Sequence, residues 1–404
     1  MKKETGSGVA FPQGFLAAGI HCGIRKNKDK KDLALIYSAV PCSAAAVYTK
    51  NRVQGAPLVV TRENLADGRA QAVICNSGIA NTCAAGGVGA ARRMCAAVAD
   101  ALGISARDVI VASTGVIGQP LPLDAIEAGI PALKKALGKD GLAAATAIMT
   151  TDTVPKQASR EFSVGGKTVR IGAIAKGSGM IHPDMATLLC FVTTDADISP
   201  VPLNEALREA VDCTLNMISI DGDTSTNDMV SIMASGLAHN PPIRGKDDGY
   251  RAFVEALTDV LAELSRMLAR DGEGATRLLE CHVKNAPSLS AARAYAKCVI
   301  SSSLVKAAFF GADANWGRIL CALGYAGLPL DPRRVDVSFS SGAGDIAVCQ
   351  NGEGLNFDEE KAKAVLSEPT VHIHIDLKDG ACCATAFGCD LTYDYVRING
   401  DYRT

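Results

Sequence analysis

The sequence predicts a mixed α/β protein, and two observations support this. Apolar strand-like runs recur along the whole chain, and segments with helical periodicity lie among them. The strands do not alternate regularly with the helices, so the pattern does not indicate a simple doubly wound sheet. At about 150 residues per domain, the chain is long enough for two or three domains or one intertwined unit.

The strands are predicted from runs rich in β-branched and other apolar residues, bounded by polar or glycine residues. The segment FSVGGKTVRI, residues 162–171, predicts a hairpin with a Gly-Gly turn. The C-terminal TYDYVRI is also strand-like, which indicates that this end of the chain is held in place. In chain order, the other strand-like runs are residues 32–38, 72–78, 108–114, 167–175, 187–196, 296–311, 334–340 and 370–377.

Three segments predict helices: residues 88–103, 203–218 and 248–272. The third has apolar residues near i, i+3, i+4 and i+7, as an amphipathic helix requires. Its end at Asp271-Gly272 fits a glycine C-cap.

Composition excludes several classes of function. Hydrophobic residues make up 48% and charged residues 21% of the chain, which is typical of a folded protein. The formal charge of −2 gives no electrostatic basis for binding nucleic acid or an anionic membrane. The N-terminus has no apolar signal segment, and no apolar run approaches the ~18 residues of a membrane span. We therefore expect a cytoplasmic protein.

Fourteen cysteines occur, mostly in apolar surroundings and without a CxxC pair. A cytoplasmic protein keeps its thiols reduced. A buried thiol packs as a small hydrophobic group. We therefore expect packing thiols, with Cys382 and Cys383 pointing to opposite faces of a strand, and neither a metal nor a redox role.

Several cofactor and metal motifs fail. Gly166-Lys167-Thr168 resembles the end of a phosphate-binding loop, but Glu161 stands where its first glycine is required. The stretch DGDTSTND, residues 221–228, lacks the acidic twelfth residue of a calcium loop and is interpreted as a polar turn near a site. His372 and His374 can share one strand face, but no acidic or cysteine partner follows at a metal-like spacing, so packing or exposure is expected.

The stretch KGSGMIHPDMATLLC, residues 176–190, carries the candidate chemistry. The Thr187 hydroxyl can attack the carbonyl carbon of Ala186, and water can then cut the resulting ester. The new N-terminal amine, with a pKa of about 7.7–8.0, can act as a general base for its own hydroxyl. On the residues alone the alternative stays open that Thr187 is a β-branched residue beginning a strand.

Eight blocks in order resemble the ornithine acetyltransferase family, also called the bifunctional glutamate N-acetyltransferase/ornithine acetyltransferase family. They cover almost the whole chain. They are GVAFPQGFLAAGI, NRVQGAPL, STGVIGQPLP, MTTDTVPK, KGSGMIHPDMATLL, DGDTSTND, FFGADANWGRIL and GCDLTYDYVRINGDYRT. The resemblance implies a mixed α/β fold shared with self-cleaving aminopeptidases, and two intertwined chains after cleavage between Ala186 and Thr187.

The resemblance also implies roles for individual residues. Thr187 would be the nucleophile, and Thr114 with Gly115 would form the oxyanion hole. Substrate would contact Thr187 and also Thr150, Lys176, Glu273, Asn399 and Thr404. A lysine can pair with a substrate carboxylate and a glutamate with the ornithine ammonium, so we hypothesise Lys176 for the first and Glu273 for the second.

Three positions depart from the family pattern. Asp184 replaces a common asparagine just before the cleavage site, and its charge would oppose an oxyanion there and slow cleavage. Ile79 and Gly400 stand where asparagine and alanine are common. None of the three is a proposed catalytic position.

The resemblance therefore implies a cytoplasmic acetyltransferase of arginine biosynthesis. It would move acetyl from N2-acetylornithine to glutamate, with no metal or organic cofactor. Some family members also accept acetyl-CoA as donor. Residues 1–186 would form an α chain and residues 187–404 a β chain, assembled as α2β2. Two alternatives stay open: a self-cleaving aminopeptidase or amidase, and a non-enzymatic metabolite-binding relative.

Overall fold

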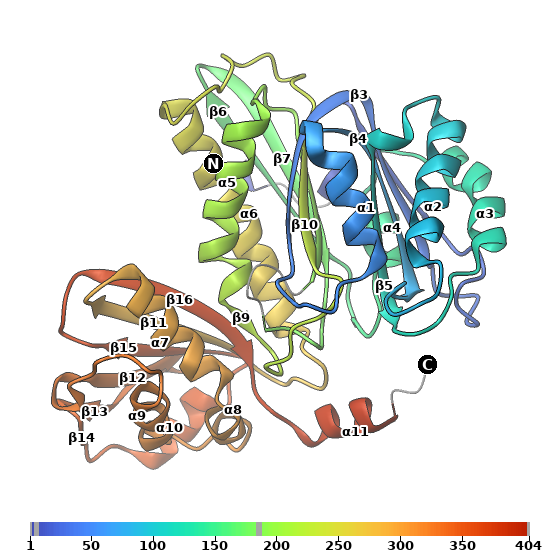
Figure 1. Ribbon diagram of the computed structural model, residues 1–404. Helices are drawn as coiled ribbons and strands as arrows, with labels where there is room; N and C mark the ends of the chain where they lie inside the picture. The colour runs from blue at the N-terminus through green and yellow to red at the C-terminus, as the bar shows by residue number, and fades with distance from the viewer. Residues whose placement is uncertain (1, 4–7, 183–187, 402–404) are drawn as a thin grey trace. The chain divides into compact units, whose positions relative to one another are not determined.

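The computed structural model describes residues 2–3, 8–182 and 188–401 (Figure 1). These residues form two compact units. The first contains Met1–Gly177, Pro183–Asn216 and Thr224–Leu264. The second contains Ser178–His182, Met217–Asp223 and Ser265–Thr404. Each unit holds one mixed sheet with helices, so the predicted α/β class is confirmed.

The first unit is built on a nine-stranded sheet in the order β1-β6-β7-β8-β10-β3-β4-β5, with β2 also paired to β3. The central strand β3 pairs with β4 on one edge, with a register shift between Tyr37 and Cys42. On its other edge the first half pairs with β2 and the second half with β10. The strands are β1 (Lys2–Lys3), β2 (Phe15–Ile20), β3 (Leu33–Tyr48), β4 (Arg69–Ile79), β5 (Val109–Val116), β6 (Lys156–Val164), β7 (Lys167–Lys176), β8 (Leu189–Thr194) and β10 (Met229–Ala234).

This sheet folds back on itself around a shared core. Side chains of β5, such as Ile110, lie in the same buried cluster as Ile174 of β7 and Phe191 of β8, although these strands are not neighbours in the sheet. Successive residues of a strand point to opposite faces. Leu33 and Leu35 of β3 therefore reach a second cluster, on the outer face. The fold brings the ends of β5 and β7 within reach of each other.

Helices cover the outer faces of this sheet (Figure 1). The second cluster contains residues of α1 (Ala56–Asn64), α2 (Gly87–Leu102) and α3 (Leu123–Lys135). On the other side, the ring of Phe253 of α6 (Asp248–Arg270) packs against Phe162 of β6 at a tilted angle. The remaining helices of this unit are α4 (Leu142–Ala147) and α5 (Pro200–Cys213).

The second unit has a seven-stranded sheet with one apolar face. Its order is β14-β13-β12-β15-β11-β16-β9. One core cluster joins that face to the covering helices, and the opposite face carries polar side chains. The strands are β9 (Ile218–Ser219), β11 (Leu278–Ala286), β12 (Asp336–Ser341), β13 (Gly344–Gln350), β14 (Glu353–Gly354), β15 (Thr370–Asp376) and β16 (Cys382–Cys389). The helices are α7 (Leu289–Ser301), α8 (Ser303–Phe310), α9 (Trp316–Gly324), α10 (Glu359–Leu366) and α11 (Tyr393–Asp401).

Most predicted elements are confirmed. The hairpin joins β6 to β7, with Val164 paired to Lys167 and Gly165 and Gly166 at φ values of 56° and 79°. The predicted helices correspond to α2, α5 and α6. Helix α6 ends at Arg270, close to the predicted end. Gly272 does not have the left-handed conformation of a glycine C-cap. A Cβ there would lie 2.7 Å from Cys389 Sγ, so glycine at this position allows close packing.

Two strand predictions were wrong. Residues 296–311 form the end of α7 and all of α8, because Ser288 and Ser302 cap these helices by accepting hydrogen bonds from Ala291 N and Val305 N. Their β-branched and aromatic residues favoured a strand reading, but their helical spacing buries them. The TYDYVRI segment lies largely in α11, a helix with no buried residue.

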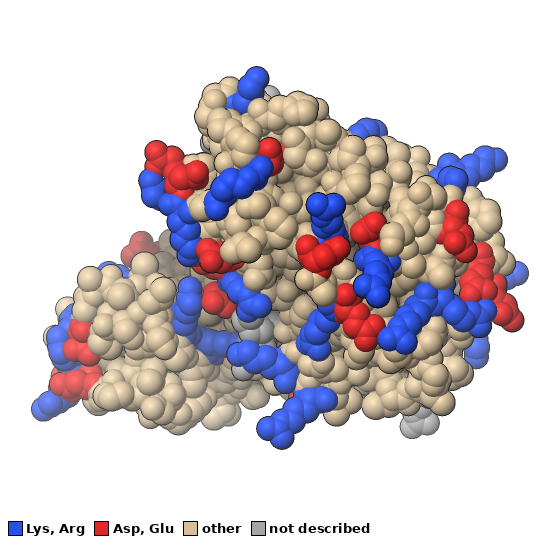
Figure 2. Space-filling view, turned by 45° about the horizontal axis from the view of Figure 1, so that its top comes forward, with Lys and Arg blue, Asp and Glu red and all other residues tan. Residues whose placement is uncertain are grey.

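The surface and the thiols agree with the composition. All 14 cysteines fall among the described residues and are free. The prediction of buried packing thiols holds for half of them, and the other seven are partly or fully exposed. The buried ones are Cys42, Cys75, Cys95, Cys190, Cys281, Cys349 and Cys389. Figure 2 shows acidic and basic side chains intermixed over the visible face. Among the helices of the described ranges, none is long and apolar enough to cross a membrane.

Candidate active site

The end of β5 places Thr114 and Gly115 beside β4. Thr114 is buried, and its hydroxyl accepts a hydrogen bond from Lys176 Nζ at 3.3 Å. Gly115 has φ 131°, and a Cβ there would lie 2.2 Å from the carbonyl carbon of Gly78. Only glycine fits this conformation and this approach of two backbones.

Lys176 ends β7, beside the first residue of the strand that follows the predicted cleavage site in the sequence. The strand register pairs Lys176 with Leu189, the first residue of β8. Thr187 and Ala186 stand two and three positions before Leu189 in the sequence and lie outside the described residues, as does Asp184. The structure thus brings together Thr114, Gly115 and Lys176 in the first unit, beside the strand that follows the cleavage site.

Asp152 connects two sequence blocks of this unit. Its carboxylate accepts hydrogen bonds from Gly177 N at 2.6 Å, from Thr150 N at 3.0 Å and from Lys156 Nζ at 2.7 Å. Lys156 is fully buried, and Asp152 is 7% exposed. Burial by itself would raise the pKa of Asp152, but Lys176 and Lys156 outweigh it and hold that pKa below its ordinary value. Asp152 therefore fixes the backbone of Thr150 next to the KGSG turn.

The DGDTSTND stretch supplies two further buried groups. Asn227 donates hydrogen bonds to the Ser113 carbonyl at 2.9 Å and the Ala80 carbonyl at 2.6 Å, and accepts one from Thr82. This network holds the end of β5 in place, next to Thr114. Burial raises the pKa of the neighbouring Asp228 carboxyl well above its usual range, and Asp228 Oδ2 has no partner among the described residues.

Sequence reasoning missed Asp152, Lys156, Asn227 and Asp228 as members of this site. A signal was available for two of them. Asn227 and Asp228 come directly before the apolar strand β10, where a buried polar side chain must find a partner. No comparable pattern in the sequence indicates that the pair of Asp152 and Lys156 is buried.

In the second unit, Glu273 and Asn399 lie together. Asn399 Nδ2 donates to Glu273 Oε2 at 2.8 Å, and Glu273 N donates to the Ser178 carbonyl at 2.8 Å. A Cβ on Gly179 would lie 2.3 Å from Glu273 Oε2, so glycine leaves room for this carboxylate. The hydrogen bond from Asn399 joins α11 to the start of the segment after α6. Thr404 lies outside the described residues.

Asp221 organises the same part of the second unit. Its carboxylate accepts hydrogen bonds from Met180 N at 2.5 Å, from Ile181 N at 2.9 Å and from the Tyr395 hydroxyl at 3.3 Å. The C-terminal helix is therefore held by polar contacts rather than by an apolar face. Two of the predicted substrate residues, Glu273 and Asn399, belong to this arrangement.

Two solved structures are similar to parts of this chain. A crystal structure of the arginine biosynthesis bifunctional protein ArgJ from Bacillus halodurans matches with a TM-score of 0.50 at 46% identity, over 52% of this chain and 98% of the solved chain. A structure of ornithine acetyltransferase complexed with ornithine, from Mycobacterium tuberculosis, matches at 38% identity with a TM-score of 0.42, over 46% of this chain and 99% of that one.

The sequence comparisons then give the family. The ArgJ family model matches residues 16–404. The arginine biosynthesis bifunctional protein ArgJ from Symbiobacterium thermophilum is 56% identical over 400 residues, 98% of each chain. The chain belongs to the ArgJ family.

Proposed function

We propose that this chain is a bifunctional acetyltransferase of arginine biosynthesis. It moves acetyl from N2-acetylornithine to glutamate, giving ornithine and N-acetylglutamate. The observation that carries the proposal is the family match over residues 16–404. The site agrees with it, because Thr114, Gly115 and Lys176 gather beside the strand that follows Thr187.

The chain first matures by cutting itself. The Thr187 oxygen attacks the Ala186 carbonyl carbon, the peptide bond becomes an ester, and water hydrolyses that ester. Residues 1–186 and 187–404 result, and Thr187 gains a free α-amine. The coverage of the Bacillus halodurans structure supports this step: one solved chain matches over 98% of its length but spans only 52% of this chain, as a cut relative would.

Transfer then proceeds in two halves. The Thr187 amine takes the hydroxyl proton as the oxygen attacks the acetyl carbonyl carbon. The C–N bond breaks, and the departing ornithine amine takes that proton. In the second half the glutamate amine attacks the acetyl ester, the C–O bond breaks, and the Thr187 oxygen regains a proton. Each half forms an oxyanion that the Thr114 hydroxyl and the Gly115 N–H stabilise.

Lys176 supports this oxyanion hole. Because the Thr114 oxygen accepts the hydrogen bond from Lys176 Nζ at 3.3 Å, its own proton is free to point at the oxyanion. The ammonium charge also favours negative charge on the reacting oxygen and attracts a substrate carboxylate. Thr150, Glu273, Asn399 and Thr404 complete the substrate contacts, with Glu273 taking the ornithine ammonium.

Family membership supports the remaining proposals. Acetyl transfer needs no metal or organic cofactor, and a parallel assay with acetyl-CoA and glutamate tests for a second donor. The two chains pair as α2β2 in the cytoplasm. Strands of residues 1–186 and 187–404 pair with each other in the first unit, β7 with β8 and β3 with β10, which supports an assembly in which both fragments stay associated.

One mass spectrum tests the proposal. Purified protein is mixed briefly with N2-acetylornithine and analysed intact under denaturing conditions. We expect two fragments divided between Ala186 and Thr187, with a single acetyl group on the fragment that begins at Thr187. Cut but unmodified fragments would instead indicate a hydrolase, and an uncut, unmodified chain would indicate a metabolite-binding relative.

Thr114→Val tests the oxyanion hole. We expect kcat per cleaved chain to fall by about 100- to 1,000-fold, because loss of one such donor raises the barrier by about 2.7–4 kcal/mol. Ser113→Ala is the matched control, since Ser113 is buried next to Thr114 but its hydroxyl has no partner among the described residues. Steady-state kinetics with N2-acetylornithine and glutamate measure both. Equal kcat values in the two variants would remove Thr114 from the mechanism.

A further inference from the structure

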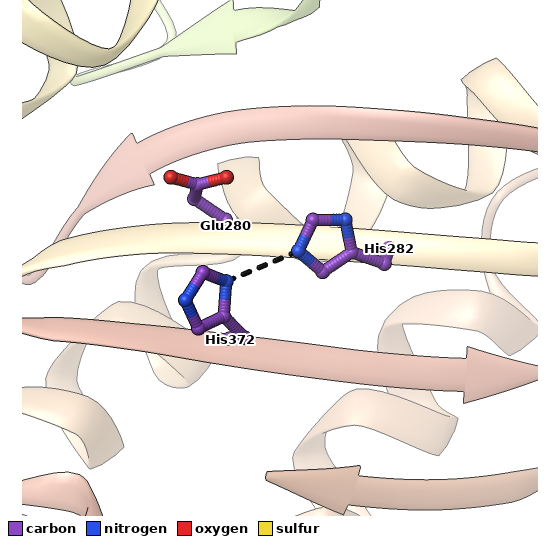
Figure 3. Close-up of side chains that lie close together, drawn as sticks. All are labelled: Glu280, His282 and His372. Atoms are coloured by element: carbon purple, nitrogen blue, oxygen red, sulfur yellow. Dashed lines mark hydrogen bonds between the residues drawn. The ribbon is translucent and has the colours of Figure 1, made fainter. Parts of the chain in front are cut away.

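A polar cluster lies on one face of the sheet in the second unit. Strands β11 and β15 run parallel, with Glu280 opposite His372 and His282 opposite His374. The alternate residues of both strands, such as Cys281 and Ile373, belong to the core on the other face. All four polar side chains therefore project from the same face, as Figure 3 shows for Glu280, His282 and His372.

Two of the three imidazoles have nitrogens at the spacing of metal ligands. His282 Nε2 and His372 Nδ1 are 3.2 Å apart. Two nitrogens bound at about 2.0–2.1 Å to one tetrahedral zinc ion are about 3.3 Å apart. A carboxylate oxygen of Glu280 and these two nitrogens all lie within 4.8 Å of one another. Small side-chain rotations bring all three atoms to one ion.

The surroundings orient His282 as a ligand. Its Nδ1 lies 3.0 Å from the Thr385 hydroxyl, which orients the ring and directs Nε2 towards His372. His374 is engaged elsewhere, because its Nε2 lies 2.7 Å from the Ser340 hydroxyl.

Glu280 carries a buried charge that needs compensation. It is 4% exposed and pairs with Arg266, whose Nε lies 3.0 Å from Glu280 Oε1. The Arg266 side chain is 48% exposed, and its guanidinium also lies over the Phe387 ring, 5.3 Å from the ring centroid. A bound cation would replace the guanidinium as the partner of this carboxylate. Arg266 and a metal ion therefore compete for the same group.

We propose that Glu280, His282 and His372 form a binding site for a divalent transition-metal ion, with water at the fourth position. Two imidazoles and one carboxylate suit zinc, cobalt or nickel, whereas magnesium and calcium prefer oxygen ligands alone. Bound metal joins β11 to β15 and stabilises the second unit. The site is separate from the proposed acetyl transfer, which uses none of these three side chains.

Cobalt(II) titration of the untagged full chain tests the site, because four-coordinate cobalt absorbs strongly in the visible range. We expect one equivalent to bind with such a spectrum, and His372→Asn to weaken binding by on the order of tenfold or more. His239→Asn is the matched control, since His239 is exposed and its φ of 50° suits asparagine. This control should bind cobalt as the unaltered chain does.

Two further variants make the test specific to the proposed geometry. Arg266→Gln should strengthen binding, because it removes the competitor for Glu280; a purely structural role of the cluster gives no such gain. Glu280→Gln should weaken cobalt binding as His372→Asn does. It replaces His372→Asn in the test if that variant does not fold. Zinc should also raise the thermal transition seen by fluorescence of Trp316, the single tryptophan, which packs on the core of this unit.

Several results would overturn the site. One such result is equal cobalt affinity in His372→Asn and in the unaltered chain. Another is the weak visible spectrum of six-coordinate cobalt. A sulfur-to-cobalt charge-transfer band that persists in His372→Asn would assign the binding to the exposed thiols, Cys83, Cys213, Cys321 and Cys383. None of these outcomes bears on acetyl transfer, so the two proposals fail independently.

Discussion

We expect Thr187→Ala to remain one uncut polypeptide and to lose acetyl transfer by on the order of 10⁴-fold or more. The alanine removes the hydroxyl that both steps need. Without it the Ala186 carbonyl is not attacked, no free α-amine forms, and no acetyl ester can be made. An intact mass under denaturing conditions measures cleavage, and an ornithine-release assay measures transfer. The oxyanion hole at Thr114 and Gly115 remains in this variant and cannot act alone.

Thr187→Ser is the matched control, because it keeps a hydroxyl at the same carbon. It should still cut and should transfer acetyl at a reduced rate. Acetyl transfer by Thr187→Ala would refute the nucleophile, and cleavage of Thr187→Ala would refute the role of this hydroxyl in maturation.

The largest effect on stability should come from Asp152→Asn. Lys156 is fully buried, and its ammonium would lose its charged partner at 2.7 Å. Removing one partner of a buried ion pair lowers the free energy of unfolding by about 3–5 kcal/mol. Urea unfolding in the uncut Thr187→Ala background measures this on a single polypeptide. Far-ultraviolet circular dichroism should follow it, because Trp316 reports only on the second unit.

The pair also predicts a dependence on pH. Because the folded state holds the pKa of Asp152 below its ordinary value of 3.8, its contribution to stability is present above that pH. The contribution is lost as the pH falls through the lowered pKa. Asp152→Asn should remove this part of the acid sensitivity.

A second substitution separates charge from packing. Lys156→Met added to Asp152→Asn removes the uncompensated charge and should restore much of the lost stability. Glu63→Gln is the control for a solvated pair, since Glu63 and Arg92 are both largely exposed; it should change the free energy by less than about 1 kcal/mol. A small effect of Asp152→Asn, or no rescue by Lys156→Met, would contradict the assignment.

The sequence predicted the elements whose pattern is local. Helix α6 has a long apolar periodicity, and the β6–β7 hairpin has a Gly-Gly turn, so both could be recognised without knowledge of the fold. Helices α7 and α8 could not be distinguished from strands in this way. Their valine, isoleucine and phenylalanine residues favour strands. The serine N-caps and the burial of one face of each segment stabilise the helices instead.

The candidate site depended on contacts that no local pattern contains. Lys176 and Thr114 are 62 residues apart in sequence, and they meet because the sheet of the first unit folds back on itself. Glu273 and Asn399 are 126 residues apart. The roles of these residues came from the family resemblance, and the structure then showed which of them are neighbours. His282 reaches His372 for a similar reason, across two strands that are adjacent only in the folded sheet.

The position of β8 has a consequence for how the two fragments behave. Strand β8 begins just after the proposed cut and lies between β7, from residues 1–186, and β10, from residues 187–404. Strand β10 in turn pairs with β3, again from the first fragment. Neither fragment can leave without opening two ladders inside a sheet and exposing its core. Folding must therefore precede cutting, and fragments produced separately would have no complete sheet to form. The hydrogen-bonded strands therefore keep the two fragments together after the bond between Ala186 and Thr187 is cut.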